Sequence, residues 1–359
     1  MAQPLVQFPD RLLEHADAVE RHVDSFLASE ADRWERVDAS LVPPLSALRE
    51  LVGAGGKRLR PAFCFAGYIG AGGNPSDPLV LDAGGALELL HTFALVHDDV
   101  MDGSDFRRSM PAIHKRFADL HTSESWSGEA RRFGEGIAIL VGDIAYVYAD
   151  QLAGRCSRAA GDVLAAIWDE LRVELCVGQS LDLLGTALRR TDLQTASRIA
   201  TYKSGKYTVE RPLHLGAALA GGTAELADAL SAIGLPLGEA FQLRDDVLGV
   251  FGDAEATGKP VGDDLREGKP TALLAHASAA TKSTAERVLL ERVGAQDLSR
   301  TEISALHELI IETGALAKVE SQIEDLTVAA HAAIAKASLA DPAAAWLNDL
   351  ADYVAWRDR

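Results

Sequence analysis

Three aspartates stand at the end of an apolar helical segment, GALELLHTFALVHDDVMD, which ends at Asp102. Asp98 and Asp102 are four residues apart, so a helix projects both carboxylates from one face, with Asp99 beside them. Two carboxylates this close repel each other, and a helix C-terminus disfavours negative charge. Mg²⁺ prefers carboxylate and phosphate oxygens, and the guanidinium groups of Arg107 and Arg108 suit phosphate oxygens. The motif therefore predicts a divalent-cation site facing a phosphate; the alternative is a solvated acidic helix end.

A second pair of acids lies further along the chain, in the segment FQLRDDVLGVFGD at 241–253. Asp245 and Asp246 fall on a predicted helix, but Gly249 stands where a third acid would share the face of Asp245. In isolation such a pair is as readily a solvated acidic face as a metal site. Two acid pairs, each beside a long charged loop, are much less expected by chance. Together they predict one cation-binding region.

Basic residues gather in three short segments of a chain that is acidic as a whole, with 35 Lys and Arg against 53 Asp and Glu. GGKRLRP (55–61) begins with two glycines at a predicted helix start, where backbone N–H groups favour an anion. In TYKSGKY (201–207), Gly205 should loosen the helix. The basic residues of the three segments are Lys57, Arg58 and Arg60, then Lys203 and Lys206, and finally Lys259 and Lys269. Each segment alone is more often solvated surface, but with the acid pairs they predict two diphosphate sites, one bridged by metal ions and one held by Lys and Arg.

The composition limits the partners and the compartment. A net charge of −18 argues against nucleic acid and against an anionic membrane surface, because both attract basic surfaces. The three cysteines, Cys64, Cys156 and Cys176, are too widely spaced to suggest a zinc site or a disulfide framework, which favours the reducing cytoplasm. The N-terminal residues lack the pattern of a signal peptide, and without a run of about 18 apolar residues no membrane span is expected.

Helices must position these residues. Apolar residues recur at helical spacing, as in 41–52, while strand-like alternation is scarce. Breaks rich in Gly or Pro are expected near 53–56, 70–78, 103–112, 177–178, 220–223, 234–238 and 252–270. Two long non-helical stretches, 103–134 and 251–271, are expected to be functional loops. Residues 1–359 are therefore predicted to form one all-α domain, a single large helical bundle with 1–50 as an N-terminal helical extension.

Taken together, the motifs resemble those of the trans-prenyltransferases, the polyprenyl diphosphate synthase family. The similarity runs from about Val52 to the C-terminus, and motifs of this kind in this order are highly specific. The matching segments are GGKRLRP (55–61), DDVMD (98–102) with Arg107 and Arg108, GD (142–143), GQSLDL (178–183), KSGKY (203–207), FQLRDD (241–246) and GKP followed by GKxT (258–271). The resemblance implies an all-α bundle around a deep central cavity, and usually a homodimer.

The resemblance also implies a reaction and its cofactor. In the family, three Mg²⁺ ions, for which Mn²⁺ can substitute, grip the diphosphate of an allylic substrate between the two acid motifs. In this chain the metal ligands would be Asp98, Asp102 and Asp245, with Asp99 and Asp246 in support. The diphosphate departs to leave an allylic cation, the double bond of isopentenyl diphosphate attacks it, and a proton is lost. Metal ions stabilise the leaving charge, and a dry cavity protects the cation from water.

The family's other functional positions carry over onto this sequence residue by residue. Those that would bind isopentenyl diphosphate are Lys57, Arg60, His91 and Arg108. Those that would bind the allylic diphosphate are Arg107, Lys203 and Lys259. Ser204 and Gln242 would face the cation, and Gln179 and Asp182 would support the cavity wall or the metal shell. The alternative for His91, Gln179 and Gln242 is a hydrogen-bonded polar residue in a helical core.

Two positions depart from the family's pattern. Ser204 stands where the family often has Thr, which keeps the hydroxyl group. Gly249 stands where many members carry the third Asp of the second acid motif. Because the first Asp of that motif carries most of the metal contact in the family, we expect activity to survive, with a change in the metal requirement left open.

The helix before the first acid motif carries the features that predict product length. Phe93 lies five residues before Asp98, so its ring should sit about 7.5 Å deeper along the helix axis and stop a growing hydrocarbon tail. Ala94 leaves room at the depth where farnesyl-producing relatives carry an aromatic residue. The resemblance associates this pattern with the twenty-carbon product, geranylgeranyl diphosphate. Farnesyl diphosphate is the nearest alternative, if neighbouring helices set the floor instead of Phe93.

Other helical proteins share parts of this pattern. A class I terpene cyclase has the bundle and the first acid motif, but it needs no second diphosphate site and its second metal motif differs. A non-catalytic partner subunit would generally have lost the acid motifs, from which only Gly249 departs here. A di-iron carboxylate protein needs two Glu-x-x-His pairs, and we find one, Glu88 with His91. A short-chain prenyl diphosphate synthase is therefore the favoured interpretation.

Overall fold

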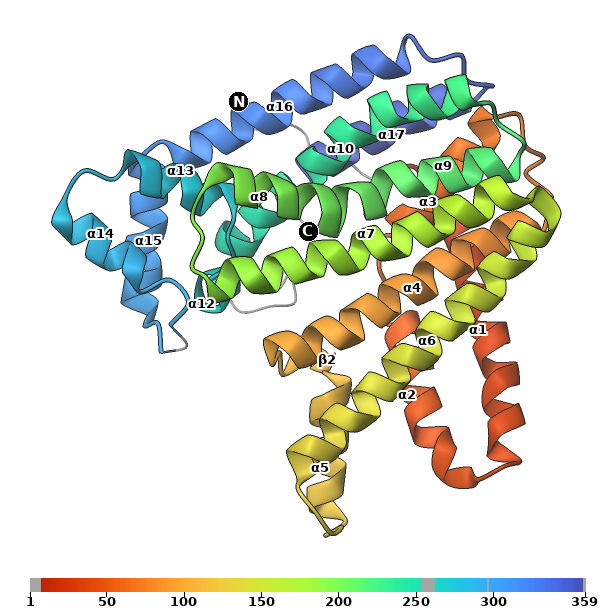
Figure 1. The fold of residues 1–359 in the computed structure, drawn as a ribbon, viewed down its shortest axis with the longest axis horizontal. Coiled ribbons are helices and arrows are strands. Elements are labelled where there is room, and N and C mark those ends of the chain that lie inside the picture. Colours follow the sequence, from red (N-terminus) through yellow and green to blue (C-terminus); the bar gives the residue numbers. More distant parts are fainter. Residues whose placement is uncertain (1–7, 253–261, 296, 358–359) are drawn as a thin grey trace.

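The computed structural model describes residues 8–252, 262–295 and 297–357, and nearly every element in it is a helix (Figure 1). The helices are α1 (Asp10–Glu35), η1 (Ala39–Leu41), α2 (Val42–Gly53), α3 (Leu59–Gly70), α4 (Leu79–Asp102), α5 (Ile113–Ser123), α6 (Ala130–Ala160), α7 (Asp162–Ala187), α8 (Leu193–Ile199), the π-helix η2 (Ala200–Glu210), α9 (Arg211–Leu219), α10 (Ala224–Phe251), α12 (Asp263–Glu267), α13 (Ala272–Ala280), α14 (Thr284–Glu291), α15 (Arg300–Glu312), α16 (Ala315–Ile334) and α17 (Ala343–Trp356). The strands β1 (Phe106–Arg107) and β2 (Met110–Pro111) form a short antiparallel hairpin. The predicted all-α fold is confirmed.

Helix α4 lies at the centre of the bundle because its first five turns carry mostly apolar residues and are largely buried on every side, with Asp82 and Glu88 as buried exceptions. Leu87, Leu89 and Leu90 are fully buried, and α1, α3 and α6 pack around the helix. The close approach of α6 requires Gly142, since a Cβ atom there would lie 2.3 Å from the ring of His97. Helix packing therefore accounts for the glycine of the GD pair at 142–143.

The N-terminal helix α1 is built into the bundle. Leu12 belongs to the core cluster that also contains residues of α3 and α17, whereas Val19 and Val23 belong to the cluster around α4 and α6. All three side chains are fully buried. The described part of 1–50 is helical, as expected, but it closes the core instead of extending from it.

The prediction of a long non-helical stretch at 103–134 is wrong in part. Helix α5 occupies the middle of this stretch and buries Ile113, Phe117 and His121, which recur every four residues. This stripe is short and is interrupted by charged residues, so the polar composition concealed it. The non-helical remainder includes the β1–β2 hairpin directly after the first acid motif.

The breaks predicted at 177–178 and 234–238 are wrong. Helix α7 runs through the first, where Gly178 makes room for the backbone of a neighbouring helix. Helix α10 runs through the second and keeps Pro236 within it. In the other expected loop, 251–271, residues 253–261 lie outside the described part of the chain, and α12 follows them.

By length and composition alone, α4 and α6 are apolar enough to cross a membrane, which the sequence analysis did not expect. In α4, 67% of the most apolar window is buried inside the bundle, as befits a central core helix. In α6 the buried share is 44%, so this helix also presents apolar residues on the outside. Two such helices are weak evidence for a membrane span, and the expectation that none exists stays a prediction.

Candidate active site

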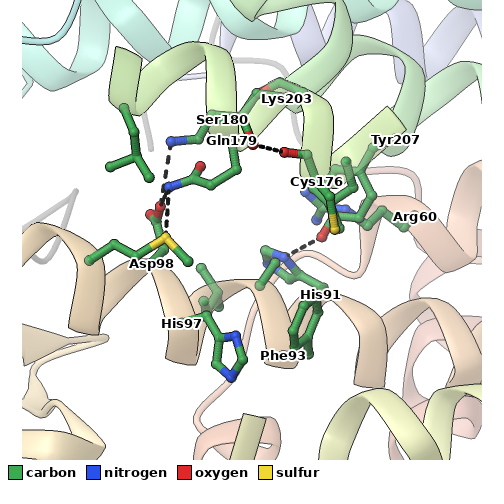
Figure 2. A pocket seen from close by; sticks show the side chains of 16 residues that line it. Arg60, His91, Phe93, His97, Asp98, Cys176, Gln179, Ser180, Lys203 and Tyr207 are labelled. Atoms are coloured by element: carbon green, nitrogen blue, oxygen red, sulfur yellow. Dashed lines mark hydrogen bonds and ion pairs between the residues drawn. The ribbon is translucent and has the colours of Figure 1, made fainter. Parts of the chain in front are cut away.

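A cavity of about 290 Å³ opens between α4, α7 and η2 (Figure 2). Residues predicted for the site that line it are Arg60, His91, Phe93, Ala94, Asp98, Gln179, Lys203 and Ser204. We call this space the carboxylate cavity, because the carboxylate-bearing Asp98 lines it. The sequence placed these residues in different motifs, and the helices bring them to one space.

At the acid end of the cavity, α7 and η2 reach across to Asp98 on α4 (Figure 2). The amide of Gln179 donates a hydrogen bond of 2.7 Å to the Asp98 carboxylate, and the Lys203 ammonium lies 3.5 Å from the same oxygen. Lys203 also pairs with the buried carboxylate of Asp182. Burial lowers the pKa of Lys203, but Asp98 and Asp182 more than offset it, so the pKa is raised and the ammonium stays charged.

One turn on, Asp102 has an incomplete environment. Its Oδ2 atom is buried and has no hydrogen-bond partner among the described residues, and the Lys269 ammonium lies 3.9 Å from it. Burial raises the pKa of Asp102 to about 6, and the nearby Asp98 carboxylate raises it too. A carboxylate oxygen in this condition fits a divalent cation.

The donor set fits Mg²⁺ held jointly by protein and substrate. Within the described residues, no three His, Cys, Asp or Glu side chains gather closely enough to cage a metal ion. Mg²⁺ is usually bound by one or two carboxylates together with substrate phosphates, so an all-protein cage is not required. Asp98 and Asp102 supply such carboxylates on one helix face.

The two acids of the second motif have different surroundings. Asp245 is more than half exposed, and the guanidinium of Arg357 lies 3.2 Å from its carboxylate. Asp246 is buried, which raises its pKa well above the usual value, and it accepts a 2.6 Å hydrogen bond from the amide of Gln242. Gln242 was expected to face a cation, but its amide is directed to Asp246 and it does not line the carboxylate cavity.

The structure explains the glycine at the end of the second motif. A Cβ atom at Gly249 would lie 1.8 Å from a carboxylate oxygen of Asp264, which comes from α12. The Asp264 carboxylate thus fills the space of a side chain at 249. It also lies 3.6 Å from the ammonium of Lys269, which in turn approaches Asp102. Asp264 was assigned no role from the sequence, and Lys269 was placed only among the basic residues of the predicted diphosphate sites.

Two residues expected near the allylic diphosphate are paired with each other. The Nε atom of Arg107 donates a 2.8 Å hydrogen bond to the carboxylate of Asp99, which is only 2% exposed. One residue along a helix turns the side chain by about 100°, so Asp99 leaves the face of Asp98 and Asp102. Lys259, also expected there, lies outside the described residues.

A second cavity of about 180 Å³ holds all four residues predicted for isopentenyl diphosphate, namely Lys57, Arg60, His91 and Arg108. We call it the guanidinium cavity. Burial lowers the pKa of Arg108; the Glu88 carboxylate raises it, and the guanidinium groups of Arg58, Arg107 and Arg60 lower it further, so that on balance the pKa is lowered and several cations lie close together here. A Cβ at Gly56 would lie 3.1 Å from the Arg108 guanidinium, and its φ of +139° also favours glycine. The crowded cations favour a multiply charged anion.

His91 and Tyr207 join the two cavities. His91 lines both, and its Nδ1 atom lies 2.7 Å from the hydroxyl of Tyr207 (Figure 2). Burial, together with the nearby Arg60, lowers the pKa of His91 well below its usual value, so the imidazole is neutral. The Arg60 guanidinium stacks 4.1 Å from the centroid of the Tyr207 ring. Tyr207 lies within KSGKY, but the sequence analysis assigned it no role.

Deeper along α4, aromatic rings border the cavity. The centroid of the Phe93 ring lies 4.7 Å from that of His97 and 4.9 Å from that of Tyr146 on α6. Phe93 and Ala94 both line the space, as their positions before Asp98 suggested. The Phe93 ring thus packs against aromatic rings of α4 and α6.

Comparison with known proteins gives the family. Residues 45–310 match the family model described as polyprenyl synthetase. The chain belongs to the polyprenyl synthetase family. It is 30% identical over 313 residues to the geranylfarnesyl diphosphate synthase of Aeropyrum pernix, covering 86% of this chain and 92% of that protein. It is 32% identical over 304 residues to the (2E,6E)-farnesyl diphosphate synthase of Mycobacterium bovis, covering 83% and 79%.

Solved structures agree with this assignment. A geranylgeranyl pyrophosphate synthase from Corynebacterium glutamicum, crystallised with isoprenyl diphosphate and magnesium, superposes with a TM-score of 0.88 at 36% identity. The alignment covers 95% of this chain and 99% of that one. The chain is therefore a prenyltransferase of the short-chain prenyl diphosphate synthase type.

Several site residues of this polyprenyl synthetase escaped the sequence analysis because they come from distant segments. Tyr353 and Arg357 of the C-terminal helix region line the guanidinium cavity, beside Lys57. Met101 and Cys176 line the carboxylate cavity. Met101 falls inside the first acid motif. The other three residues lie in no motif that would have singled them out.

Proposed function

We propose that this prenyltransferase joins isopentenyl diphosphate head to tail (1′-4) to allylic diphosphates, depends on Mg²⁺, and releases geranylgeranyl diphosphate. One observation carries the proposal. Two cavities, one lined by Asp98 and Lys203 and the other by the guanidinium groups of Arg58, Arg60, Arg108 and Arg357, share Arg60 and His91 in their walls. Two diphosphates bound in this way would bring their hydrocarbon parts together at the shared wall.

The carboxylate cavity receives the allylic substrate. Asp98 and Asp102 on α4, with Asp245 from the wall of the guanidinium cavity, would hold Mg²⁺, three ions by family resemblance with Mn²⁺ as a substitute. The bound metal would neutralise the departing diphosphate. Lys203, next to Asp98, contributes a further positive charge to that diphosphate. Ser204 lines the same wall, and its hydroxyl oxygen would stabilise the carbon that becomes positive.

The guanidinium cavity orients the second substrate. Lys57, Arg60 and Arg108 bind the diphosphate of isopentenyl diphosphate without a metal ion, since the cations are already in place. The carbon–oxygen bond to the allylic diphosphate breaks first, the double bond of isopentenyl diphosphate then attacks the allylic cation, and the proton lost from the adduct passes to the released diphosphate. Leu175 and Leu183 keep the cavity apolar, which protects the cation from water.

Geranylgeranyl diphosphate is the proposed product because Phe93 borders the cavity and Ala94 leaves space above it. The similar proteins do not decide the length, since their names include farnesyl and geranylfarnesyl diphosphate synthases. Farnesyl diphosphate is the alternative product. A class I terpene cyclase is disfavoured by the guanidinium cavity, for which a cyclase has no use.

The proposal includes a homodimer in the cytoplasm. Exposed apolar side chains lie at helical spacing on the outer faces of α6 and α7, including Leu140 and Val147 on α6 and Val173, Val177 and Leu184 on α7. A second copy of the chain would cover such a face, as the family resemblance implies. The three cysteines are free thiols, which suits a reducing compartment.

A product assay tests the proposal. Purified protein would be incubated with Mg²⁺, isopentenyl diphosphate and, in separate reactions, dimethylallyl, geranyl and farnesyl diphosphates, and the dephosphorylated products would be sized by mass. Geranylgeraniol from all three primers is the expected result. Farnesol as the longest product would overturn the proposed length, and no elongation by folded protein would overturn the condensation itself.

A further inference from the structure

The π-helix η2 is wedged between two helices at backbone contact. A Cβ atom at Gly178 of α7 would lie 2.2 Å from the backbone nitrogen of Lys203, and one at Gly238 of α10 would lie 2.5 Å from Cα of Gly205. No side chain separates the three backbones at these points. These contacts fix how far η2 lies from α7 and α10. They do not fix how η2 is rotated about its axis or shifted along it, so further contacts must do so.

Those contacts come from one stripe of α7. Glu174, Gly178 and Asp182 recur every four residues and so share a helix face. On one side of the glycine contact, Asp182 pairs with Lys203 in the first half of η2. On the other side, Glu174 pairs with Lys206 in the middle of η2 and with Arg211, the first residue of α9. The two acids thus hold η2 at several points along the segment that carries the cavity residues.

Glu174 makes the larger set of contacts. It is 5% exposed, and the Arg211 guanidinium donates two hydrogen bonds to its carboxylate, of 2.7 and 2.8 Å. The ammonium of Lys206 pairs with the same carboxylate. A two-pronged contact of this kind fixes geometry as well as charge. Glu174 itself does not line either described cavity.

The residues between these grips are the ones that face the substrates. Ser204 and Tyr207 line the carboxylate cavity, and the Tyr207 hydroxyl lies 2.7 Å from His91. A π-helix is rare and tends to mark a functional site, because its wider turn is less favourable than an α-helix. A return of η2 to α-helical hydrogen bonding would turn these side chains around the axis and away from their present partners.

We propose that Glu174 is a positioning residue for prenyl transfer, which holds η2 in its π-helical register through Lys206 and Arg211. Lys203 is thereby kept at Asp98, and Ser204 and Tyr207 at the cavity wall. The kinetic part of this inference rests on the proposed function. The structural part, that Glu174 holds the register of η2, does not.

The test compares Glu174→Gln with Glu170→Gln in the full chain. Glu170 is exposed on α7 one turn earlier, so the control removes the same charge from the same helix. In Glu174→Gln we expect faster hydrogen exchange in peptides covering 200–210, with peptides of α4 unchanged. With the assay above, we expect kcat to fall roughly 10²-fold and KM for the allylic diphosphate to rise about tenfold, because small displacements at a reacting centre are costly.

The control is expected to match the wild type in all three readouts. Exchange and kinetics of Glu174→Gln equal to those of the control would overturn the inference. A lower melting temperature with unchanged kcat and KM would also overturn it, because Glu174 would then be merely structural. Arg211→Lys, which retains the charge but loses the two-pronged contact, is the second variant if Glu174→Gln does not fold, and the same shifts are expected in smaller size. If the wild type makes no product, the proposed function fails, and hydrogen exchange still decides whether Glu174 holds η2.

Discussion

The two cavities are proposed to bind diphosphates by different means. In the guanidinium cavity the positive charge is supplied by the chain itself, and Lys57, Arg60 and Arg108 are already gathered. In the carboxylate cavity, Asp98 stands with Lys203 and Arg60, and one turn beyond it on α4 Asp102 keeps a buried oxygen without a hydrogen-bond partner in the described part of the structure. Under the proposal, a diphosphate binds in the first cavity through side chains alone and in the second through metal ions held by these carboxylates. The difference suits a reaction in which one diphosphate stays and the other must leave.

The largest effect is expected from Asp98→Ala. Loss of this carboxylate removes a metal ligand and a partner of Lys203 and Gln179, so kcat should fall roughly 10³-fold or more. Steady-state kinetics would measure the fall, and circular dichroism would check that the helical bundle is retained. A rate near that of the wild type would remove Asp98 from the metal site and weaken the contrast between the cavities.

Lys57→Met should weaken binding of isopentenyl diphosphate and leave the metal requirement unchanged. Loss of one cation from the guanidinium cavity should raise KM for isopentenyl diphosphate about 10- to 100-fold, the usual effect of losing a charged hydrogen bond. The Mg²⁺ concentration for half-maximal activity should stay as in the wild type. A variant whose Mg²⁺ requirement changes and whose KM does not would show that the two cavities are not separate in this way.

Gly249→Ala tests the carboxylate supplied by α12. The new Cβ would meet Asp264 at 1.8 Å and push it from Lys269, so the Mg²⁺ requirement should rise and kcat should fall about tenfold. Gly136→Ala is the matched control, since a Cβ there meets nothing within 4 Å. Equal behaviour of the two variants would mean that Asp264 contributes nothing to the carboxylate cavity.

The smallest effect on rate, but a visible effect on product, is expected from Phe93→Ala. Removing the ring leaves the hydrocarbon end open toward His97 and Tyr146, so products longer than those of the wild type should appear. Ala94→Phe should do the reverse and shorten the product. Mass analysis of the dephosphorylated products measures both. Unchanged lengths in the two variants would move the floor of the cavity to another helix.

The sequence could predict features that depend on local spacing, but not those that depend on how helices pack together. Asp98 and Asp102 lie on one helix face, so their spacing alone indicated a shared site. The four residues assigned to isopentenyl diphosphate meet in one cavity because two short motifs and α4 converge there. Asp264 could not be foreseen, because its role depends on how α12 packs against α10.

Other contacts were hidden for the same reason. The pairing of Arg107 with Asp99 depends on the β1–β2 hairpin, whose strands of two residues each are too short to be predicted from a sequence pattern. The π-helical register of η2 depends on contacts with α7 and α10. Spacing within a helix is a local property that a sequence reveals, whereas contact between helices is decided by the packing of the whole bundle.

The most direct test of the account is whether the carboxylate cavity needs a metal ion to bind its substrate. Geranyl thiodiphosphate, which resists ionisation, would be titrated calorimetrically into the wild type and into Asp98→Ala, each with Mg²⁺ and with a chelator. The account predicts tight binding only to the wild type with Mg²⁺, and a large loss of affinity in the other three titrations. Equal affinity of the wild type with Mg²⁺ and with the chelator would contradict it.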